Sequence, residues 1–310
     1  MTKVFIDGSV GTTGLQIVDR LQGRNDLTLL SIDEAVRKDP AARAERMNEA
    51  DVVFLCLPDD AAKEAVTLIT NPHTCVIDTS TAHRTDDSWV YGFPELGFSH
   101  AIARAKRIAN PGCHATGFIS IVYPLVKAGV VSVDTALTCF SLTGYSGGGK
   151  KMIAQYEAEE KPDALLSPGI YATAQRHKHL PEMVKICRLN TAPVFCPIVD
   201  DYYKGMAVTV PLHSSIAGGV KKGSVRYILE EFYRGAKLIS VASTEETEGL
   251  STIYANAKAG TDSLRLIVAG TDDSYTVTAL FDNLGKGASG AAIENMNLVL
   301  GLDPTTGLVV

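Results

Sequence analysis

The sequence has no apolar run long enough to cross a membrane, which takes about 18 to 20 residues. The longest candidate, Thr116–Val126, is interrupted by Pro124 and followed by Lys127. The first residues pass directly into a strand-like segment and lack the basic, apolar and cleavage regions of a secretory signal. We therefore expect a soluble, cytoplasmic protein without a membrane partner.

The chain also lacks an excess of basic residues and closely spaced cysteine pairs. It has 29 Lys and Arg against 35 Asp and Glu among 310 residues, a net charge of −6, which argues against a nucleic-acid partner. The six cysteines include no Cys-x-x-Cys pair, so neither a zinc ribbon nor a disulfide framework is expected. With 45% hydrophobic and 21% charged residues, the sequence predicts a folded chain of one or two domains.

The first part of the chain alternates short apolar runs with helical patterns. Near-continuous apolar strands are typical of a parallel sheet that helices cover on both faces. This predicts an α/β fold with a doubly wound, Rossmann-type dinucleotide-binding domain over residues 1–112. The predicted strands are Val4–Asp7, Leu27–Asp33, Asp51–Leu57 and Cys75–Asp78, and the predicted helices are Leu15–Leu21, Ala41–Ala50 and Ala61–Ile69.

The pattern changes after Pro111. A helical pattern over Ala115–Lys127 is followed by alternating apolar runs that are typical of antiparallel strands. We expect an α+β catalytic and oligomerisation domain with a mixed, largely antiparallel sheet over residues 113–284. An amphipathic pattern over Ala288–Leu300 predicts a helix that returns to the first domain, so that residues 285–310 complete it. The predicted strands are Ala136–Leu142, Met206–Leu212, Ser263–Ala269 and Tyr275–Ala279.

Three glycines, Gly8, Gly11 and Gly14, follow the first predicted strand at intervals of three. Glycine in such a turn lets the backbone approach a phosphate and lets the helix pack closely on the strand, while the helix N-terminus offers N–H groups to an anion. The spacing differs from the commoner Gly-x-Gly-x-x-Gly. Its place between a strand and a helix still favours a dinucleotide site over an ordinary turn.

The residues after the second predicted strand bear on the choice of cofactor. Asp33 and Glu34 stand where an acidic residue favours the 2′-hydroxyl of NAD. Arg37 and Lys38 follow closely and are suited to the 2′-phosphate of NADP. The residues alone leave both cofactors open.

Cys113 is the cysteine expected to react. It follows an Asn-Pro-Gly turn and precedes a predicted helix, and a helix N-terminus lowers the pKa of a thiol. Cys56, Cys75 and Cys139 lie in predicted strands and are expected to be small buried hydrophobic residues.

Two histidines and a carboxylate are candidates to serve such a thiolate. His177 and His179 are followed by Glu182, which is spaced to orient His179 in a Cys–His–acid relay. A metal site on the two histidines is disfavoured because Arg176 and Lys178 oppose a cation and no third ligand is recognisable. The remaining alternative is two surface histidines on a basic loop.

A second glycine-rich segment, Ser141–Lys150, ends in a cation. Its consecutive backbone N–H groups are suited to hold a phosphate, with Lys150 as a point charge. Lys151 stands where a Walker loop has Ser or Thr, so the segment is not a P-loop. A flexible hairpin is the alternative.

In this order, the motifs resemble those of the N-acetyl-γ-glutamyl-phosphate reductases, within the semialdehyde dehydrogenase superfamily. Three further segments agree with that family: residues 78–84 with its Asp-x-Ser-x-x-x-Arg, residues 91–95 with its Tyr-Gly-Leu-Pro-Glu, and residues 282–288 with its Asp-Asn-Leu-x-Lys-Gly-Ala. The likeness covers nearly the whole chain. The compact length, and His114 where many members have Tyr, resemble the shorter type of the family.

The resemblance implies NADP(H)-dependent reduction of N-acetyl-L-glutamyl 5-phosphate to the 5-semialdehyde, with release of phosphate, in arginine biosynthesis. It implies Cys113 as the nucleophile that forms a thioester and His179 as the acid/base, with Glu182 and Tyr171 in support. No metal is implied, and NAD(H) is the alternative cofactor. The implied cofactor contacts are Gly8, Ser9, Gly11, Thr12, Thr13, Gly14, Ser80, Gly147 and Asn283, and the candidate substrate or phosphate contacts are Arg84, Asn110, Lys150 and His177.

Other functions share parts of this pattern. Aspartate-semialdehyde dehydrogenase uses the same chemistry, and a catalytically silent dinucleotide sensor would keep the glycine turn without an activated cysteine. A Cys–His hydrolase would have no use for that turn. Because a sheet in the second domain is expected to be exposed, and because the family commonly assembles so, we expect a homodimer or homotetramer.

Overall fold

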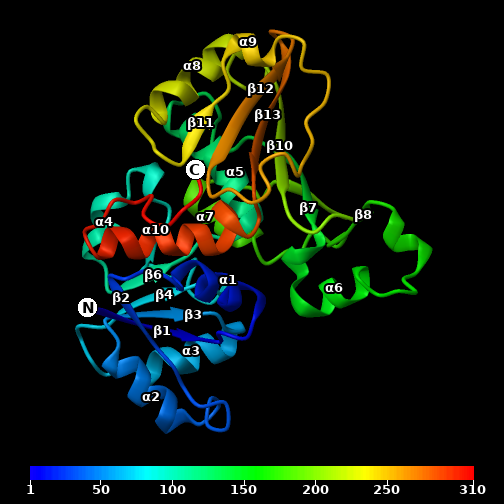
Figure 1. The fold of residues 1–310 in the computed structure, drawn as a ribbon. Coiled ribbons are helices and arrows are strands. Elements are labelled where there is room, and N and C mark those ends of the chain that lie inside the picture. Colours follow the sequence, from blue (N-terminus) through cyan, green and yellow to red (C-terminus); the bar gives the residue numbers. More distant parts are fainter. The chain divides into compact units, whose positions relative to one another are not determined.

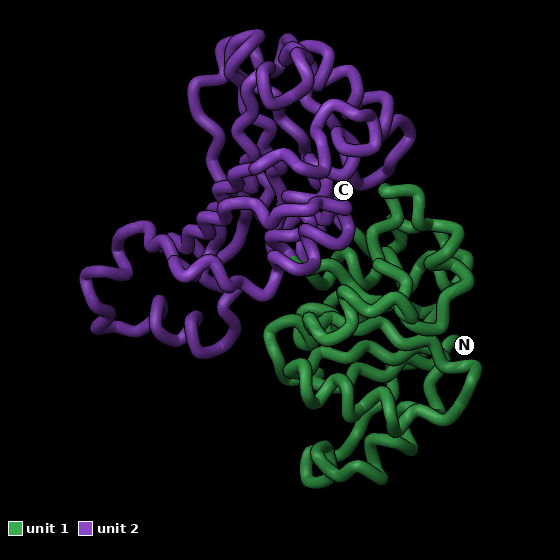
Figure 2. The backbone as a smooth tube through the Cα atoms, turned by 180° about the vertical axis from the view of Figure 1, so that it is seen from behind, with its two compact units in different colours: residues 1–112, 288–308 green, residues 113–287, 309–310 purple.

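The computed structural model describes all 310 residues and divides into two compact units (Figures 1 and 2). Unit 1 comprises residues 1–112 and 288–308, and unit 2 comprises residues 113–287 and the last two residues. Each unit contains one sheet. No helix in either unit is both long and apolar enough to cross a membrane.

Unit 1 is built on a six-stranded sheet in the order β2-β1-β3-β4-β6-β5, in which every neighbouring pair is parallel. The chain reverses its direction of travel across the sheet between β1 and β3, and ligands of doubly wound sheets bind at the carboxyl ends of strands beside such a reversal. The strands are β1 (Thr2–Asp7), β2 (Leu27–Leu30), β3 (Val52–Leu55), β4 (Cys75–Asp78), β5 (Val90–Tyr91) and β6 (Arg107–Ala109).

Helices cover both faces of this sheet, as the near-continuous apolar strands predict (Figure 1). One face packs against Ile17 of α1, Ile102 of α4 and Ile293 of α10, and the other against Met47 of α2 and Ala62 of α3. The predicted doubly wound fold is confirmed. The helices are α1 (Thr12–Leu21), α2 (Pro40–Glu49), α3 (Asp59–Thr67), α4 (Ser99–Arg104) and α10 (Gly290–Val299), with a short 3₁₀ turn, η1, at Pro94–Leu96.

The α10 helix differs from the amphipathic helix predicted for this segment, because every residue of Gly290–Asn297 is buried. Its polar side chains form buried hydrogen bonds instead of a solvated face. Asn295 donates to the carbonyl of Gly92, and Asn297 accepts from Arg24. Sequence periodicity does not distinguish a polar residue that faces water from one that bonds inside a core.

Two strand predictions in unit 1 extend too far. β2 ends at Leu30, so Asp33 lies in the loop that follows and its carboxylate accepts from the backbone N–H of Ala35 at 2.8 Å. β3 ends at Leu55, so Cys56 follows the strand instead of lying in it. Apolar runs predict strands well in the middle but poorly at their ends.

Unit 2 is built on a seven-stranded mixed sheet in the order β11-β12-β13-β10-β7-β9-β8. The β7/β10, β10/β13, β12/β13 and β8/β9 pairs are antiparallel, whereas β7/β9 and β11/β12 are parallel. The predicted mixed, largely antiparallel sheet is thus confirmed. The strands are β7 (Thr138–Gly144), β8 (Gly169–Ile170), β9 (Val194–Asp200), β10 (Met206–His213), β11 (Ile239–Val241), β12 (Leu264–Gly270) and β13 (Ser274–Phe281).

Helix α5 (Cys113–Lys127) packs on the centre of this sheet. Gly117 permits the close approach, since a Cβ there would stand 2.4 Å from the side chain of Val208 on β10. The other helices of the unit are α6 (Gly149–Tyr156), α7 (Leu180–Cys187), α8 (Lys222–Phe232) and α9 (Thr244–Thr247), with short helical turns η2 (Tyr145–Gly148), η3 (Asp163–Leu166) and η4 (Gly285–Ser289).

Helix α5 contains Pro124, which has no N–H to donate to the carbonyl of Ser120 one turn earlier. The hydroxyl of Tyr233, just after α8, donates to that carbonyl at 2.8 Å. Ser120, Pro124 and Tyr233 are all buried. A side chain far along the sequence thus replaces the missing helical hydrogen bond.

Replacing Tyr233 by Phe is expected to lower the free energy of unfolding by about 1–3 kcal/mol, because the buried carbonyl of Ser120 loses this donor. Urea unfolding followed by circular dichroism measures the change. Tyr227→Phe is the matched control, since Tyr227 is an exposed tyrosine within α8, and it should change stability by less than about 0.5 kcal/mol. Equal effects of the two substitutions would contradict this account.

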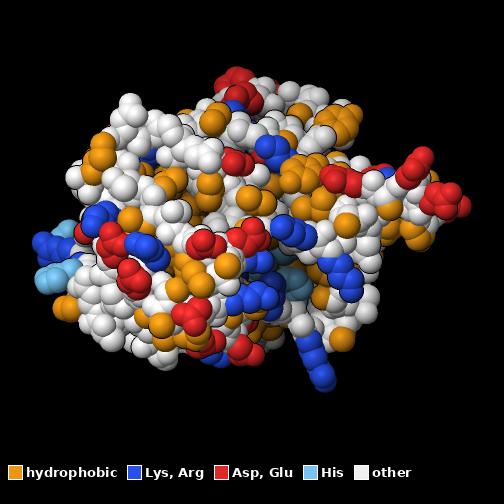
Figure 3. Space-filling model, turned by 60° about the horizontal axis from the view of Figure 1, so that its bottom comes forward, with side chains coloured by type: hydrophobic (Ala, Val, Ile, Leu, Met, Phe, Trp, Pro, Cys, Tyr) orange, Lys and Arg blue, Asp and Glu red, His pale blue; other side chains and the backbone are white.

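Charged side chains of both signs occur on the face of the molecule drawn in Figure 3. On this face, Lys and Arg side chains are interspersed with Asp and Glu. The net charge of the whole chain is −6.

Candidate active site

Cys113 is the first residue of α5. The sequence predicts it just before the helix, and in either position the thiol stands at the positive end of the helix dipole, where a thiolate is stabilised. Gly287 lies against it, and a Cβ built on that glycine would stand 3.0 Å from the Cβ of Cys113. Glycine at that position therefore leaves room beside the cysteine.

Two histidines lie beside the Cys113 thiol. The Cys113 sulfur, a ring nitrogen of His114 and a ring nitrogen of His179 all lie within 4.8 Å of one another. His114 follows Cys113 in α5, and His179 is the N-cap residue of α7. Two helix N-termini therefore bring the three side chains together.

His114 is buried and uses both ring nitrogens. Its Nδ1 lies 2.6 Å from the hydroxyl of Ser141 on β7, and its Nε2 lies 2.7 Å from the hydroxyl of Tyr171. Burial, together with the nearby His177 and Lys178, lowers the pKa of His114 to about 3. The His114 ring is therefore neutral at neutral pH.

The segment from Tyr171 to His179 is fixed by an unusual turn. Ala172 and Gln175 both adopt left-handed backbone conformations, with φ of 51° and 55°. The side-chain amide of Gln175 donates to the carbonyl of Phe195 at 2.8 Å and accepts from the N–H of Phe195 at 2.9 Å. This pair of bonds holds the strained turn against β9, so Tyr171 and the histidines have defined positions.

The structure distinguishes the two histidines of the predicted motif. His179 is buried and belongs to the group around the Cys113 sulfur. His177 accepts the backbone N–H of His179 on its Nδ1 at 3.2 Å, and its ring centroid lies 4.8 Å from that of His179. Burial and the adjacent Lys178 lower the pKa of His177 to about 4. His177 is thus a neutral neighbour of His179, and its predicted contact with substrate or phosphate stays a prediction.

Glu182 is buried in the first turn of α7, three residues after His179. A carboxylate there is favourably placed toward the positive end of the helix dipole. Its predicted role, to orient His179, stays a prediction.

A thiol and two imidazoles are also a set that zinc binds. The sequence shows no third ligand beside the two histidines of the motif, whereas the fold brings Cys113 and His114 to His179. Both nitrogens of His114 are already engaged with Ser141 and Tyr171. The arrangement favours thiol and imidazole chemistry.

Other cysteines are held in unreactive states. Burial raises the pKa of the Cys56 thiol to about 12 and that of Cys75 to about 11, and it raises the pKa of Cys139 still further. These thiols are protonated at neutral pH, so they are poor nucleophiles.

The second glycine-rich segment forms the end of β7, the turn η2 and the start of α6. Asn283 holds this segment: its side chain donates to the Ser146 hydroxyl at 3.0 Å and accepts from the N–H of Gly205 at 2.9 Å. Gly147 lies beside Asn283, and Lys150 is exposed in the first turn of α6. The predicted contacts of Gly147, Asn283 and Lys150 with cofactor or phosphate stay predictions.

In unit 1, the first glycine turn joins β1 to α1. Gly8 has φ of +87°, and a Cβ there would stand 2.3 Å from the carbonyl oxygen of Cys56. A Cβ on Gly14 would stand 2.3 Å from the carbonyl oxygen of Gly8. Gly11 is the N-cap residue of α1. Because glycine has no side chain to accept a hydrogen bond there, the backbone N–H groups of the first helical turn point toward the preceding loop. These residues, with Ser9, Thr12 and Thr13, form the turn between β1 and α1, and their predicted contacts with a dinucleotide stay predictions.

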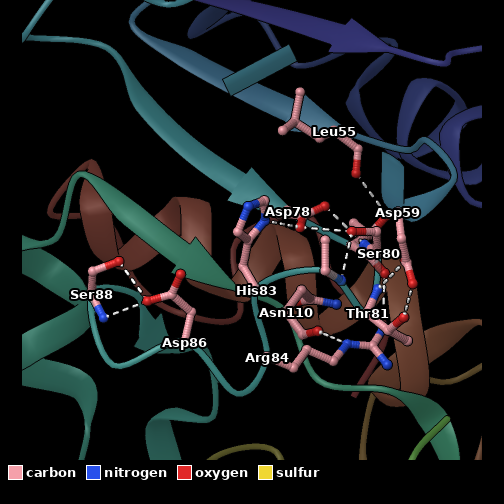
Figure 4. A network of polar contacts seen from close by, with 12 residues as sticks. Leu55, Asp59, Asp78, Ser80, Thr81, His83, Arg84, Asp86, Ser88 and Asn110 are labelled. Atoms are coloured by element: carbon pink, nitrogen blue, oxygen red, sulfur yellow. Dashed lines mark hydrogen bonds and ion pairs between the residues drawn. The ribbon is translucent and has the colours of Figure 1, made fainter. Parts of the chain in front are cut away.

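Polar side chains gather after β4 in unit 1 (Figure 4). Asp78 accepts from the N–H and the hydroxyl of Ser80 at 2.9 and 2.7 Å, and it lies 2.6 Å from Nδ1 of His83. Arg84 donates to the backbone carbonyls of Asn110 and Thr79. The predicted ligand contacts of Ser80 and Arg84 stay predictions, and the bonds seen here fix the loop.

Asn110 is buried and bonds within unit 1. Its side chain donates to the carbonyl of Ala288 at 3.0 Å and accepts from Asn295 at 3.1 Å. These bonds tie the turn before residue 113 to the returning C-terminal segment. A substrate contact of Asn110 stays a prediction.

The comparisons with known proteins agree with this geometry. Residues 28–105 match the family model described as "Semialdehyde dehydrogenase, NAD binding domain", and residues 113–283 match "Semialdehyde dehydrogenase, dimerisation domain". The chain belongs to the semialdehyde dehydrogenase family. The glycine turn itself precedes the first matched segment, while Cys113 begins the second.

Similar relatives within this family carry one name. N-acetyl-gamma-glutamyl-phosphate reductase from Sinorhizobium medicae is 46% identical over 305 residues, which cover 96% of this chain and 98% of that protein. The protein of the same name from Brucella ovis is 46% identical over 306 residues, covering 96% and 99%. The resemblance inferred from the motifs is therefore confirmed.

Solved structures of the semialdehyde dehydrogenase family share the fold. Aspartate semialdehyde dehydrogenase II from Vibrio cholerae superposes with a TM-score of 0.73 at 16% identity, covering 97% of this chain and 98% of that one. The enzyme from Francisella tularensis superposes with a TM-score of 0.69 at 14% identity, covering 97% and 100%. At this identity the likeness shows the fold alone.

The structure also shows residues at the site that sequence reasoning missed. His114 entered the sequence argument only as a mark of the shorter family type, and Ser141 only as the start of a glycine-rich segment. Gln175 had no signal at all. A histidine directly after the cysteine expected to react was the one clue available from the sequence.

Proposed function

We propose that this chain reduces N-acetyl-L-glutamyl 5-phosphate to N-acetyl-L-glutamate 5-semialdehyde and inorganic phosphate, a step of arginine biosynthesis. The observation that carries the proposal is the Cys113 thiol at a helix N-terminus with two histidine nitrogens within 4.8 Å. The name of the relatives at 46% identity supplies the substrate. The aspartate semialdehyde dehydrogenases share only the fold, so that substrate is the weaker candidate.

NADP(H) is the cofactor of this reaction. A Cβ at Gly8 or Gly14 would collide with the protein's own backbone, so glycine permits the tight strand-to-helix turn at which a dinucleotide pyrophosphate binds. Arg37 and Lys38 suit a 2′-phosphate, with Arg37 also lying 3.8 Å from the Glu34 carboxylate, and the Asp33 carboxylate is engaged by its own loop. When bound, NADPH supplies the hydride that reduces the thioester to a hemithioacetal oxyanion.

The chain's own residues carry the remaining chemistry. His179 takes the proton of the Cys113 thiol, and the thiolate attacks the acyl carbon. The C–O bond to phosphate breaks, phosphate leaves with the bonding electron pair, and a thioester remains. Backbone N–H groups of the first turn of α5 are suited to stabilise the oxyanion, which is worth about 3–4 kcal/mol. When the hemithioacetal later releases the aldehyde, the Cys113 sulfur leaves as a thiolate and regains the proton from His179.

The reverse reaction tests the proposed function. Purified protein with N-acetylglutamate semialdehyde, phosphate and NADP⁺ is expected to produce NADPH, detected by its nicotinamide absorbance, and the reaction should require phosphate. NAD⁺ and aspartate semialdehyde serve as parallel alternatives. Preference for aspartate semialdehyde would transfer the assignment to the sister activity, and no reaction despite dinucleotide binding would favour a silent sensor.

We further propose that the chain forms a homodimer through one face of the unit 2 sheet. On this face, Phe140 of β7, Ile170 of β8 and Val194 of β9 are 41%, 63% and 55% exposed. Phe140 and Cys196 are paired in register, as are Ile170 and Ile198, so these side chains form one apolar surface. Apolar patches of this kind usually mark an interface. The matched family domain is described as a dimerisation domain, which favours a second copy of this chain as the occupant.

Replacing Phe140 by Asp is expected to weaken self-association at least about 30-fold, because a charge would be buried within the apolar face. Analytical ultracentrifugation over a concentration series measures the change. Tyr227→Asp, on the exposed side of α8, is the control and should leave the assembly unchanged. An unaltered dimer in the Phe140 variant would rule out this face.

A further inference from the structure

Ser141, His114 and Tyr171 form a continuous chain of hydrogen bonds from β7 to the neighbourhood of Cys113. The two bonds measure 2.6 and 2.7 Å, and they join residues 27 and 57 positions apart in the sequence. A neutral imidazole donates from one ring nitrogen and accepts on the other. The hydrogen bonds of this chain can therefore run in two directions, since His114 donates either to Ser141 or to Tyr171.

The charge of Cys113 distinguishes these directions. The Tyr171 hydroxyl bonds to His114, whose ring nitrogen lies within 4.8 Å of the Cys113 sulfur. If Tyr171 donated to His114, its oxygen lone pairs would face the thiolate. In the other direction Tyr171 accepts from His114 and keeps its own proton for the thiolate, and a hydrogen bond to a charged acceptor is about twice as strong as a neutral one. Burial and the nearby Cys113 charge also raise the pKa of Tyr171, which keeps that proton in place.

We propose that Ser141 and His114 are positioning residues that aim the Tyr171 hydroxyl proton at the Cys113 sulfur. Ser141 donates to Nδ1 of His114, His114 donates from Nε2 to the Tyr171 oxygen, and Tyr171 donates to the thiolate. Each donor keeps its own hydrogen, so the hydrogen-bond chain stabilises the Cys113 thiolate without transferring a proton. The proposal rests on the proposed function only in taking Cys113 as the nucleophile.

Other titratable and charged side chains lie around this hydrogen-bond chain and also affect the titration of Cys113. His177 and Lys178 lie near His114 from the loop, and His179 faces it from the start of α7 with a ring-centroid distance of 5.4 Å. Glu182 is buried in the first turn of α7. All of them stay unchanged in the variants below, so differences between variants report on the hydrogen-bond chain.

The test is the pKa of Cys113, measured from the pH dependence of its alkylation by iodoacetamide in the full-length chain without substrate or cofactor. Mass spectrometry of the peptide that contains Cys113 separates it from the other cysteines. Tyr171→Phe is expected to raise this pKa by about 1 unit, the lower end of the effect of one hydrogen bond to a charged group.

Two replacements of His114 distinguish a role in orienting the Tyr171 hydroxyl from a purely structural role. Glutamine places its amide nitrogen near the former Nε2 and keeps a donor for Tyr171, whereas asparagine places its amide nitrogen near the former Nδ1 and keeps a contact only for Ser141. His114→Asn should raise the Cys113 pKa about as much as Tyr171→Phe, and His114→Gln should stay within about 0.3 units of the wild type. The double variant H114N/Y171F should shift no further than Tyr171→Phe alone.

Three results would overturn the proposal. Equal shifts for His114→Asn and His114→Gln would indicate a structural role, and additive shifts in the double variant would mean that His114 acts on Cys113 without Tyr171. The third is an unchanged Cys113 pKa in His114→Asn. If that variant does not fold, as judged by circular dichroism, Ser141→Ala replaces it: a rise of about 0.5 units supports the chain, and no rise overturns it.

The outcome is separable from that of the proposed function, because alkylation needs neither substrate nor NADP(H). An inactive wild type that shows the expected pattern of pKa shifts would reject the reductase alone. An active wild type without the pattern would reject the hydrogen-bond chain alone.

Discussion

Cys113→Ser is expected to lower kcat at least about 10⁴-fold while the dissociation constant for NADPH changes less than about threefold. A serine hydroxyl is not ionised at neutral pH. It therefore stays a weak nucleophile toward the acyl phosphate, even with His179 beside it. Serine is also a good residue for a helix N-terminus, so α5 should still form. Initial rates of NADPH formation and NADPH fluorescence titration measure the two quantities.

Cys196→Ser is the matched control for this experiment. Cys196 is a free, half-buried cysteine on β9, in the same unit as Cys113 but outside the group around its sulfur. The control should keep kcat within about threefold. If Cys113→Ser retained more than a tenth of the wild-type rate, a thioester on Cys113 would be excluded as the main route.

The fold of unit 1 was predictable because its information is local. Each strand is a short apolar run that helices bury on both sides, and Gly8, Gly11 and Gly14 mark the first strand-to-helix turn. The errors arose where tertiary contacts decide. α10 is buried all round because Asn295 and Asn297 find partners from distant parts of unit 1, and no pattern within the helix reports those partners.

The sheet of unit 2 was less predictable. The alternating strands β7, β10, β12 and β13 show in the sequence, but β8 has two residues and β9 contains Pro197. Proline lowers the strand signal of a segment, although Pro197 pairs in register with Ser141 of β7. The parallel β7/β9 pair joins segments about fifty residues apart, which local periodicity does not relate.

The sequence predicted the reactive residue of the site, but not the side chains that hold the surrounding residues in position. Cys113 stands out because a Pro-Gly turn and a helix start are both visible in the sequence. His114 gains its role from Ser141 and Tyr171, and Gln175 gains its role from the backbone of Phe195. These partners come from other strands and loops, so only the folded chain reveals them.

His179→Asn is expected to lower kcat by about 10²–10⁴-fold, the usual loss when a general acid or base is removed. Its ring nitrogen lies within 4.8 Å of the Cys113 sulfur, where it can take the thiol proton and return it. Stopped-flow measurement of acylation and steady-state rates would show a slower acylation step, with less change in KM. Asparagine keeps a polar side chain at the N-cap of α7, so the helix should persist.

His177→Asn is the control that decides between the two histidines of the motif. Its Nδ1 accepts the N–H of His179, and an asparagine oxygen can accept in its place, so kcat should fall less than about tenfold. A larger loss in His177→Asn than in His179→Asn would reassign the acid/base role. Equal large losses would mean that the loop holding both rings, fixed by Gln175 on β9, had moved. Since both histidines share that loop, only the ratio of the two losses identifies the group that carries the proton.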